Sequence, residues 1–151
     1  MILFLDFDGV LHPNGCWRDR HFEYLPNLEQ VLRDLPAVQV VISSTWRHAE
    51  SLDQLRSRFS PDVRHRIVGV TPSWRDLGGT HQAARQRECE AWLASQLASR
   101  ATAWLAVDDT AAYFDPGCQQ LFLLEADEKG FAGLDDAWAK RLRARLLAEM
   151  G

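Results

Sequence analysis

Short apolar runs alternate with longer amphipathic segments along this chain, and this alternation limits the possible folds more than any other feature. The runs are almost continuously hydrophobic, which is typical of strands that are covered on both faces of a sheet. We predict strands at Ile2–Leu5, Val38–Ile42, Arg66–Val70, Trp104–Val107 and Leu121–Leu124. Apolar residues at helical spacing predict helices at Asn27–Leu35, Arg47–Phe59, Gln82–Ser99 and Asp135–Glu149. Repeated strand–helix succession predicts an α/β fold with a mostly parallel sheet.

Length, charge and cysteine usage set the broad class. With 151 residues and no visible linker, we predict a single domain over residues 1–151. The net charge of −4 gives no general argument for nucleic-acid or membrane binding. Cys16, Cys89 and Cys118 are widely spaced and form no CxxC pair, which argues against a disulfide framework and suits a reducing cytosol. We find neither a signal peptide nor a membrane span, and we expect a cytoplasmic protein.

Polar residues follow three of the predicted strands, each at the point where the strand ends. They are Asp6 and Asp8, then Ser43, Ser44 and Thr45, and then Asp108 and Asp109. Ligands of open α/β sheets bind beyond the carboxyl ends of the strands. We therefore predict that these polar groups gather at one edge of the sheet.

Each of these short motifs has an ordinary structural explanation when it is taken alone. An Asp-x-Asp pair is often a solvated strand end, an Asp-Asp pair is often a turn or a cap, and Ser-Ser-Thr is often the N-cap of a following helix. Their joint occurrence at three strand ends favours a site instead. Three or four carboxylates in one small pocket require a counter-cation, and Mg²⁺ suits carboxylate and phosphate oxygens best. A serine hydroxyl, from Ser44 or Ser43, could then hold a phosphate oxygen.

At these residues the chain resembles the haloacid dehalogenase-like (HAD) superfamily. The segments that carry the resemblance are FLDFDGVL, VVISSTWR and WLAVDDT, and it extends to RQRECEAWL and KGFAGL. The chain is most similar to the small HAD domains, nearly without a cap, that are grouped with RNA-repair-like phosphatases. The resemblance implies a Rossmann-like three-layer sandwich with a five-stranded sheet in the order 5-4-1-2-3.

The resemblance also implies roles for individual residues. Asp6 would be the nucleophile that forms an aspartyl-phosphate, and Asp8 would protonate the leaving oxygen and then activate water. Ser44 would hydrogen-bond a phosphate oxygen, with Ser43 as the alternative.

The same resemblance implies a Mg²⁺ site. Asp6, the backbone carbonyl of Asp8 and Asp108 would be its ligands. Asp109 would be a further ligand or would lie next to the ion.

The chain departs from the family pattern at the third motif, where a lysine is expected. Lys129 and Lys140 lie too late in the sequence, and the candidates at the expected place are Arg85, Arg87 and His81. We favour Arg85, since it precedes the predicted helical stripe at the right spacing and its guanidinium supplies the charge and a bidentate fork. Arg87 is the alternative.

Spacing and the second aspartate narrow the reaction. Asp8 favours phosphatases over dehalogenases, since halide needs no proton when it leaves. The intervals between the motifs leave no room for a substantial cap domain. An open site favours hydrolysis, and the resemblance to this family implies that such a site acts on large substrates, such as a nucleic-acid end or a phosphoprotein.

Two segments combine basic and aromatic residues. Arg18, Arg20 and two histidines, His12 and His21, surround Trp17, and Trp74 is followed by Arg75. Such residues could grip nucleic acid. We favour the interpretation that both tryptophans pack loops against the sheet, and that Trp46 is a core or helix-packing residue.

We therefore expect a Mg²⁺-dependent phosphatase that acts on a phosphate monoester. The alternatives are a phosphate-binding or protein-interaction module without turnover, and a phosphotransferase. The predicted partner is a phosphorylated substrate and not a membrane.

Overall fold

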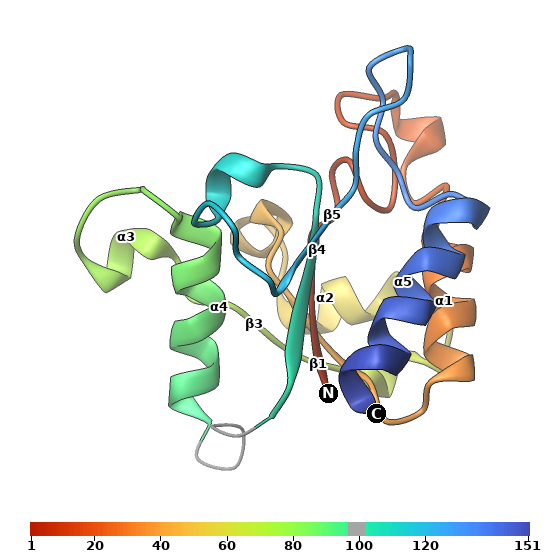
Figure 1. Ribbon diagram of the computed structural model, residues 1–151. Helices are drawn as coiled ribbons and strands as arrows, with labels where there is room; N and C mark the ends of the chain where they lie inside the picture. The colour runs from red at the N-terminus through yellow and green to blue at the C-terminus, as the bar shows by residue number, and fades with distance from the viewer. Residues whose placement is uncertain (97–101) are drawn as a thin grey trace.

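The computed structural model describes residues 1–96 and 102–151, and its centre is a five-stranded sheet whose neighbouring strands all run parallel (Figure 1). The strands are β1 (Ile2–Leu5), β2 (Gln39–Ile42), β3 (Ile67–Val70), β4 (Trp104–Asp108) and β5 (Leu121–Leu123). Their order is β3-β2-β1-β4-β5, the one that the family resemblance implied, and every strand lies within one residue of its predicted bounds.

Helices cover both faces of this sheet. They are α1 (Leu25–Asp34), α2 (Leu52–Ser57), α3 (Trp74–Leu77), α4 (Ala84–Ser95) and α5 (Asp136–Met150). Short 3-10 turns lie at η1 (Arg18–Arg20), η2 (Thr45–His48), η3 (Arg64–Arg66) and η4 (Ala111–Tyr113). In Figure 1, α1 and α5 lie on one side of the strands and α4 lies on the other. The predicted three-layer, Rossmann-like α/β sandwich is confirmed.

The central strand explains why the apolar runs are continuous. Along β1, Leu3 and Leu5 pack into the core on the α1 and α5 side. Ile2 and Phe4 pack into the core on the α4 side, where the Phe4 ring meets Trp92 edge-on with the ring centroids 5.9 Å apart. Since successive side chains of a strand point to opposite faces, a strand covered on both faces must be apolar at every position.

The predicted helix Arg47–Phe59 is wrong as a single element. The chain forms η2, leaves helical geometry, and begins α2 only after Ser51. The Ser51 hydroxyl accepts from the Gln54 backbone N–H, and the Gln54 side chain accepts from the Ser51 N–H. This capping box satisfies the free backbone donors of a new helix start.

Smaller differences concern the other helices. α1 begins at Leu25, two residues before its predicted start, and Pro26 lies in its first turn. α4 begins at Ala84, after Ala83 in a left-handed conformation, and ends at Ser95. The last three residues of the helix predicted at Gln82–Ser99 lie outside the described part of the chain. α3 had not been predicted, because four residues carry too little periodicity.

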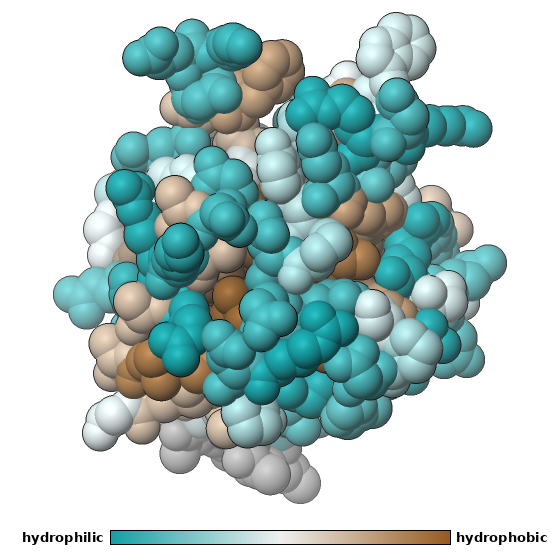
Figure 2. All heavy atoms as spheres, turned by 90° about the vertical axis from the view of Figure 1, so that its right-hand side faces the viewer, coloured by the Kyte–Doolittle hydropathy of each residue, from teal (hydrophilic) through white to brown (hydrophobic). Residues whose placement is uncertain are grey.

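The carboxyl ends of the strands are covered only by loops and short turns, and the described residues contain no inserted cap domain. The loop after β1 lies beside the segment before α5, where the Leu134 N–H donates to the Val10 carbonyl at 2.8 Å (Figure 1). The face on the α1 and α5 side is mainly hydrophilic, with small hydrophobic areas (Figure 2). Within residues 1–96 and 102–151, no helix is long and apolar enough to cross a membrane.

Candidate active site

Parallel pairing in the middle of the sheet brings Asp6 and Asp108 together. Leu5 is paired with Val107, and the Asp6 N–H donates to the Val107 carbonyl at 3.2 Å, so the residues that follow lie side by side. Both are buried, with Asp6 at 7% and Asp108 at 1% exposed surface. Asp109 completes the group, and one carboxylate oxygen from each residue lies within 4.8 Å of the others. Three of the predicted acidic residues therefore form one cluster.

Gly9 allows Asp109 to approach the loop after β1. Its φ is +77°, and a Cβ atom at this position would lie 2.0 Å from the Asp109 Oδ2 atom. A side chain would therefore be strained and would also collide with a carboxylate of the cluster. The glycine of the DxDG motif is required here for both reasons.

Arg85 supplies the positive charge of the cluster. Its Nη1 atom lies 2.8 Å from Asp108 Oδ2 and 3.2 Å from Asp6 Oδ1, and its Nε atom lies 3.7 Å from Glu88 Oε2. Arg87, the alternative, instead donates to the backbone carbonyls of Gly78 and Thr80. The structure thus brings Arg85, and not Arg87, to the carboxylates.

His81, the third candidate for this position, lies away from the cluster. It is exposed, and its ring stands beside Trp74 with the centroids 6.0 Å apart.

Burial dominates the electrostatics of the acidic cluster. It raises the pKa of Asp6, against the attraction of Arg85. Burial, followed by the charge of Asp6, raises the pKa of Asp108 to about 7. Burial also raises the pKa of Asp109. Three carboxyl groups thus share one guanidinium, and the excess negative charge is what a divalent cation would neutralise.

Asp8 lies at the same edge in a different environment. Its side chain is 38% exposed, and its Oδ1 atom is 2.7 Å from His12 Nε2. Trp46 Nε1 donates to both carboxylate oxygens, at 3.3 and 3.2 Å. The hydrogen bond from His12 is the largest cause that lowers the pKa of Asp8, and it outweighs partial burial.

The tautomer of His12 follows from its second ring nitrogen. His12 is buried, and its Nδ1 atom accepts from the Phe22 N–H at 3.2 Å, so the proton of a neutral ring is on Nε2 and faces Asp8. Phe22 adopts a left-handed φ of +62°, which is costly for a large side chain. From the sequence, His12 belongs to a basic surface segment and Trp46 is a packing residue. Neither interpretation anticipates that both side chains hydrogen-bond to Asp8.

The serines after β2 lie beneath the site. Ser43 and Ser44 are buried, and the Ser44 hydroxyl accepts from the Trp46 N–H at 3.3 Å. Arg47 Nη1 donates to both of their carbonyls, at 2.7 and 2.9 Å. The phosphate contact of Ser44, or of Ser43, stays a prediction.

A pocket of about 120 Å³ opens over the acidic cluster. It is lined by Asp6, Asp8, Asp109 and Arg85 together with Asn14, Thr45, Thr110 and Tyr113. Thr45 was among the polar residues predicted to gather at this edge of the sheet, whereas Asn14, Thr110 and Tyr113 had not been assigned to a site. Thr45 lines this pocket, whereas the two serines that precede it do not. The sequence carried no comparable signal for Asn14 or Tyr113.

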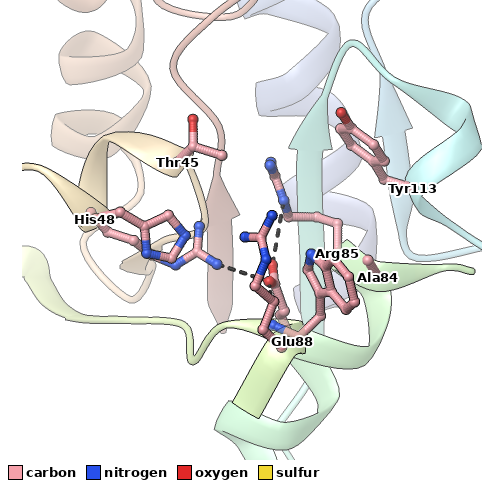
Figure 3. Close-up of a pocket in the computed structure, with 9 residues that line it drawn as sticks. Thr45, His48, Ala84, Arg85, Glu88 and Tyr113 are labelled. Carbon is pink, nitrogen blue, oxygen red and sulfur yellow. Dashed lines mark hydrogen bonds and ion pairs between the residues drawn. The ribbon is translucent and has the colours of Figure 1, made fainter. Parts of the chain in front are cut away.

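A second hollow of about 230 Å³ adjoins this pocket and shares Thr45, Arg85 and Tyr113 with it. In the view of Figure 3, Arg85 lies between His48 and Tyr113, and Glu88 lies below Arg85. Trp74 lines this hollow, so the interpretation that it merely packs a loop was incomplete. Trp17 is 86% exposed, and the prediction that it packs against the sheet is wrong.

Comparison with known protein families agrees with this geometry. A family model described as the HAD domain in Swiss Army Knife RNA repair proteins matches residues 2–139. No curated protein and no solved structure matches the chain. The matched segment contains the DxDG motif, Arg85 and the Asp108–Asp109 pair. The chain therefore belongs to this family of HAD domains, and its fold is that of HAD hydrolases and phosphotransferases.

Proposed function

We propose that the protein is a Mg²⁺-dependent phosphatase that hydrolyses a phosphate monoester through an aspartyl-phosphate on Asp6. The observation that carries this proposal is the double ion pair of Arg85 with Asp6 and Asp108 at the floor of an open pocket. These ion pairs hold the carboxylate of Asp6 in place where a phosphate can enter, next to the carboxyl groups of Asp108 and Asp109.

The acidic cluster fits a magnesium ion. Asp6, Asp108 and Asp109 offer hard oxygen ligands within 4.8 Å of one another, and one arginine does not neutralise all three. In this site Asp6, Asp108 and the carbonyl of Asp8 would hold the ion, with Asp109 as a ligand or a neighbour. When bound, Mg²⁺ supplies positive charge to the phosphate oxygens.

In the first step an oxygen of Asp6 attacks phosphorus, and the bond from phosphorus to the ester oxygen breaks. Arg85 holds the carboxylate in place, and its charge lowers the repulsion between Asp6 and the phosphate. Asp8 donates a proton to the leaving oxygen. The approach of a phosphate raises the pKa of a nearby carboxyl group, which favours the protonated form of Asp8 at this stage.

In the second step water attacks phosphorus and releases Asp6. Asp8, now ionised, accepts the proton of that water. The hydrogen bonds from His12 and Trp46 stabilise the ionised carboxylate and fix its orientation, which suits this base role.

The alternatives share these residues. A phosphotransferase would replace water by another acceptor, and the pocket is open to both. A binding module without turnover was suggested by the missing lysine. Arg85 makes the ion pairs to both Asp6 and Asp108, and this supports an enzyme instead.

Location in the cytoplasm and organisation as one domain are also proposals. The free cysteines Cys16, Cys89 and Cys118 support a reducing compartment.

The first test is hydrolysis of p-nitrophenyl phosphate with and without Mg²⁺, by the wild type, by Asp6→Asn and by Asp136→Asn. Asp136 is an exposed aspartate on α5 and serves as the matched control. We expect Mg²⁺-dependent turnover that is lost in Asp6→Asn and kept in Asp136→Asn. Turnover that survives in Asp6→Asn would refute the nucleophile.

A further inference from the structure

The second hollow directly adjoins the acidic pocket. We call it the Trp74 hollow, and its outer lining is Trp74 and Arg75 from α3, His48 from η2 and Tyr113 from η4. It shares Thr45, Arg85 and Tyr113 with the pocket over Asp6. A group bonded to a phosphate in that pocket can therefore extend directly into the hollow.

The charged groups deep in the hollow are already paired. Arg47 lies 2.9 Å from Glu88, and its guanidinium also donates to backbone carbonyls of Thr71 and Pro72. Arg85 is held by Asp6 and Asp108. These buried arginines shape the hollow, but their charge is balanced by neighbouring carboxylates.

Arg75 differs from these arginines. It is exposed and lies over the Trp74 ring, 5.0 Å from the centroid, and no salt bridge to it is found among the described residues. Its charge is therefore free for an anion at the mouth of the hollow. Partial burial, and then Arg47, lower the pKa of His48, so its ring is neutral near pH 7 and adds a hydrogen-bonding group.

Two aromatic rings also line the hollow. Tyr113 is 44% exposed, and the centroid of its ring lies 5.3 Å from the Cζ atom of Arg85. Trp74 is half-buried, and its backbone N–H donates to Glu88 at 2.8 Å, which fixes the start of α3. A free cation beside aromatic faces is the combination that holds bases and phosphates of single strands.

We propose that the Trp74 hollow binds the terminal nucleoside of a nucleic-acid strand whose end phosphate lies over Asp6, and that Arg75 pairs with the next phosphodiester. This inference rests on the proposed function for the placement of the phosphate. Asp6 then displaces the sugar oxygen from phosphorus, Asp8 protonates that oxygen, and water releases the phosphate from Asp6. The products are inorganic phosphate and a strand with a hydroxyl end. A phosphoserine residue carries no ring that would follow its phosphate into the hollow, and an unmodified neighbouring residue offers no second phosphate to Arg75.

Binding tests the hollow without requiring turnover. We would measure the affinity of Asp6→Asn protein for a fluorescent RNA octamer with a 3′-phosphate or a 5′-phosphate, at several salt concentrations. Adding Trp74→Ala should weaken the binding of one of these octamers about tenfold, the usual effect of losing one stacked base. Adding Arg75→Gln should reduce the slope of log K against log salt by about 0.7, as expected for one lost phosphate contact.

The chain offers matched controls for both substitutions. Arg141 is an exposed arginine that lies over Trp138 on α5, 4.8 Å from the ring centroid, so Arg141→Gln reproduces the loss of charge away from the site. Trp74→Phe keeps a stacking ring and should retain most of the affinity, which separates lost stacking from misfolding. Trp17→Ala tests the exposed loop tryptophan.

The outcomes separate this inference from the proposed function. The proposal for the Trp74 hollow would be overturned by unchanged affinity in Trp74→Ala and Arg75→Gln or by no octamer binding at all. Losses of the same size in Arg141→Gln or Trp17→Ala would also overturn it. So would a phosphoserine peptide that binds as tightly with the same losses. Asp6-dependent hydrolysis of p-nitrophenyl phosphate would then still support the phosphatase. Binding as expected without turnover of any phosphate would support the hollow and refute the phosphatase.

Discussion

Asp6 and Asp8 are separated by one residue and lie at one edge of the sheet, yet their surroundings are opposite. Asp6 is buried beside Asp108 and Asp109, and its pKa is raised despite Arg85. Asp8 is partly exposed, accepts hydrogen bonds from His12 and Trp46, and has a lowered pKa. We call these the arginine side and the histidine side of the site.

The difference suits the two proposed roles. A nucleophile gains from being rigid and shielded from water, and a buried cation opposes the rise of its pKa that burial causes. An acid–base group must exchange protons, so it needs access to solvent and a stable orientation. Two identical side chains thus acquire different chemistry from burial on one side and from hydrogen-bond donors on the other.

Removing the cation from the arginine side should give the largest effect. In Arg85→Met the buried carboxylates lose their partner, and we expect a loss of about 3–5 kcal/mol in the free energy of unfolding without metal. Urea unfolding and p-nitrophenyl phosphate hydrolysis would measure this, with Arg87→Met as the control. Arg85→Lys, which keeps the charge, should lose less of both. Equal effects of Arg85→Met and Arg87→Met would contradict the assignment.

The two sides should also respond to pH in opposite directions. Because the pKa of Asp108 is raised from 3.8 to about 7, the folded state binds its proton more tightly, so stability without metal falls as pH rises between these values. The change is at most about 4 kcal/mol. The pKa of Asp8 is lowered below 3.8 in the folded state, so Asp8 adds to the free energy of unfolding above pH 3.8, and this contribution is lost as the pH falls further.

Urea unfolding between pH 4 and 8 would test this by the difference in the free energy of unfolding between the wild type and Asp108→Asn. We expect the difference to vanish at the acidic end of this range, and excess Mg²⁺ to restore wild-type stability at pH 8. A difference that does not depend on pH would show that Asp108 is not the titrating group.

The boundary between the two sides can be tested at Gly9. Gly9→Ala should destabilise the protein by about 1–3 kcal/mol through its left-handed backbone and should also displace Asp109. Gly15→Ala is the control, since Gly15 has a φ of +71° and nothing within 4 Å of an added Cβ. We expect similar stability losses but lost hydrolysis only in Gly9→Ala. Full hydrolysis in Gly9→Ala would show that the position of Asp109 is unimportant.

The histidine side should show the smallest change in stability, about 0.5–1.5 kcal/mol for each hydrogen bond of His12 that is lost. His12→Gln should slow hydrolysis of alkyl phosphates more than that of p-nitrophenyl phosphate, because a poor leaving group depends on the proton from Asp8. Trp46→Phe removes only the longer hydrogen bonds and should have a weaker effect. If both substrates slow equally in His12→Gln, its role is general packing.

Much of the fold could be predicted from the sequence. A strand that is buried on both faces appears in the sequence as a continuous apolar run. The predicted strand bounds therefore lie within one residue of the observed ones. The break between η2 and α2 could not be predicted from apolar spacing, because it depends on a capping box between Ser51 and Gln54. Trp17 was misjudged because burial of a loop residue depends on the path of the loop.

For the candidate site, the meeting of the acids with Arg85 could be predicted, because strand ends and motif spacing are local properties. The contacts of His12 and Trp46 with Asp8 could not be predicted, since they depend on the path of the loops after β1 and β2. Trp46 lies 38 residues from Asp8 in the sequence, and only the folded chain brings the two together.

The central position of β1 has a consequence for how this site opens. β1 is paired on both sides, by β2 and β4, so Asp6 is attached to backbone that should exchange its amide hydrogens only when the whole molecule unfolds. Trp74 and Tyr113 stand instead on α3 and η4, single turns that can unfold locally. The walls that select a substrate can therefore fluctuate, or change during evolution, while the reactive carboxylates stay fixed.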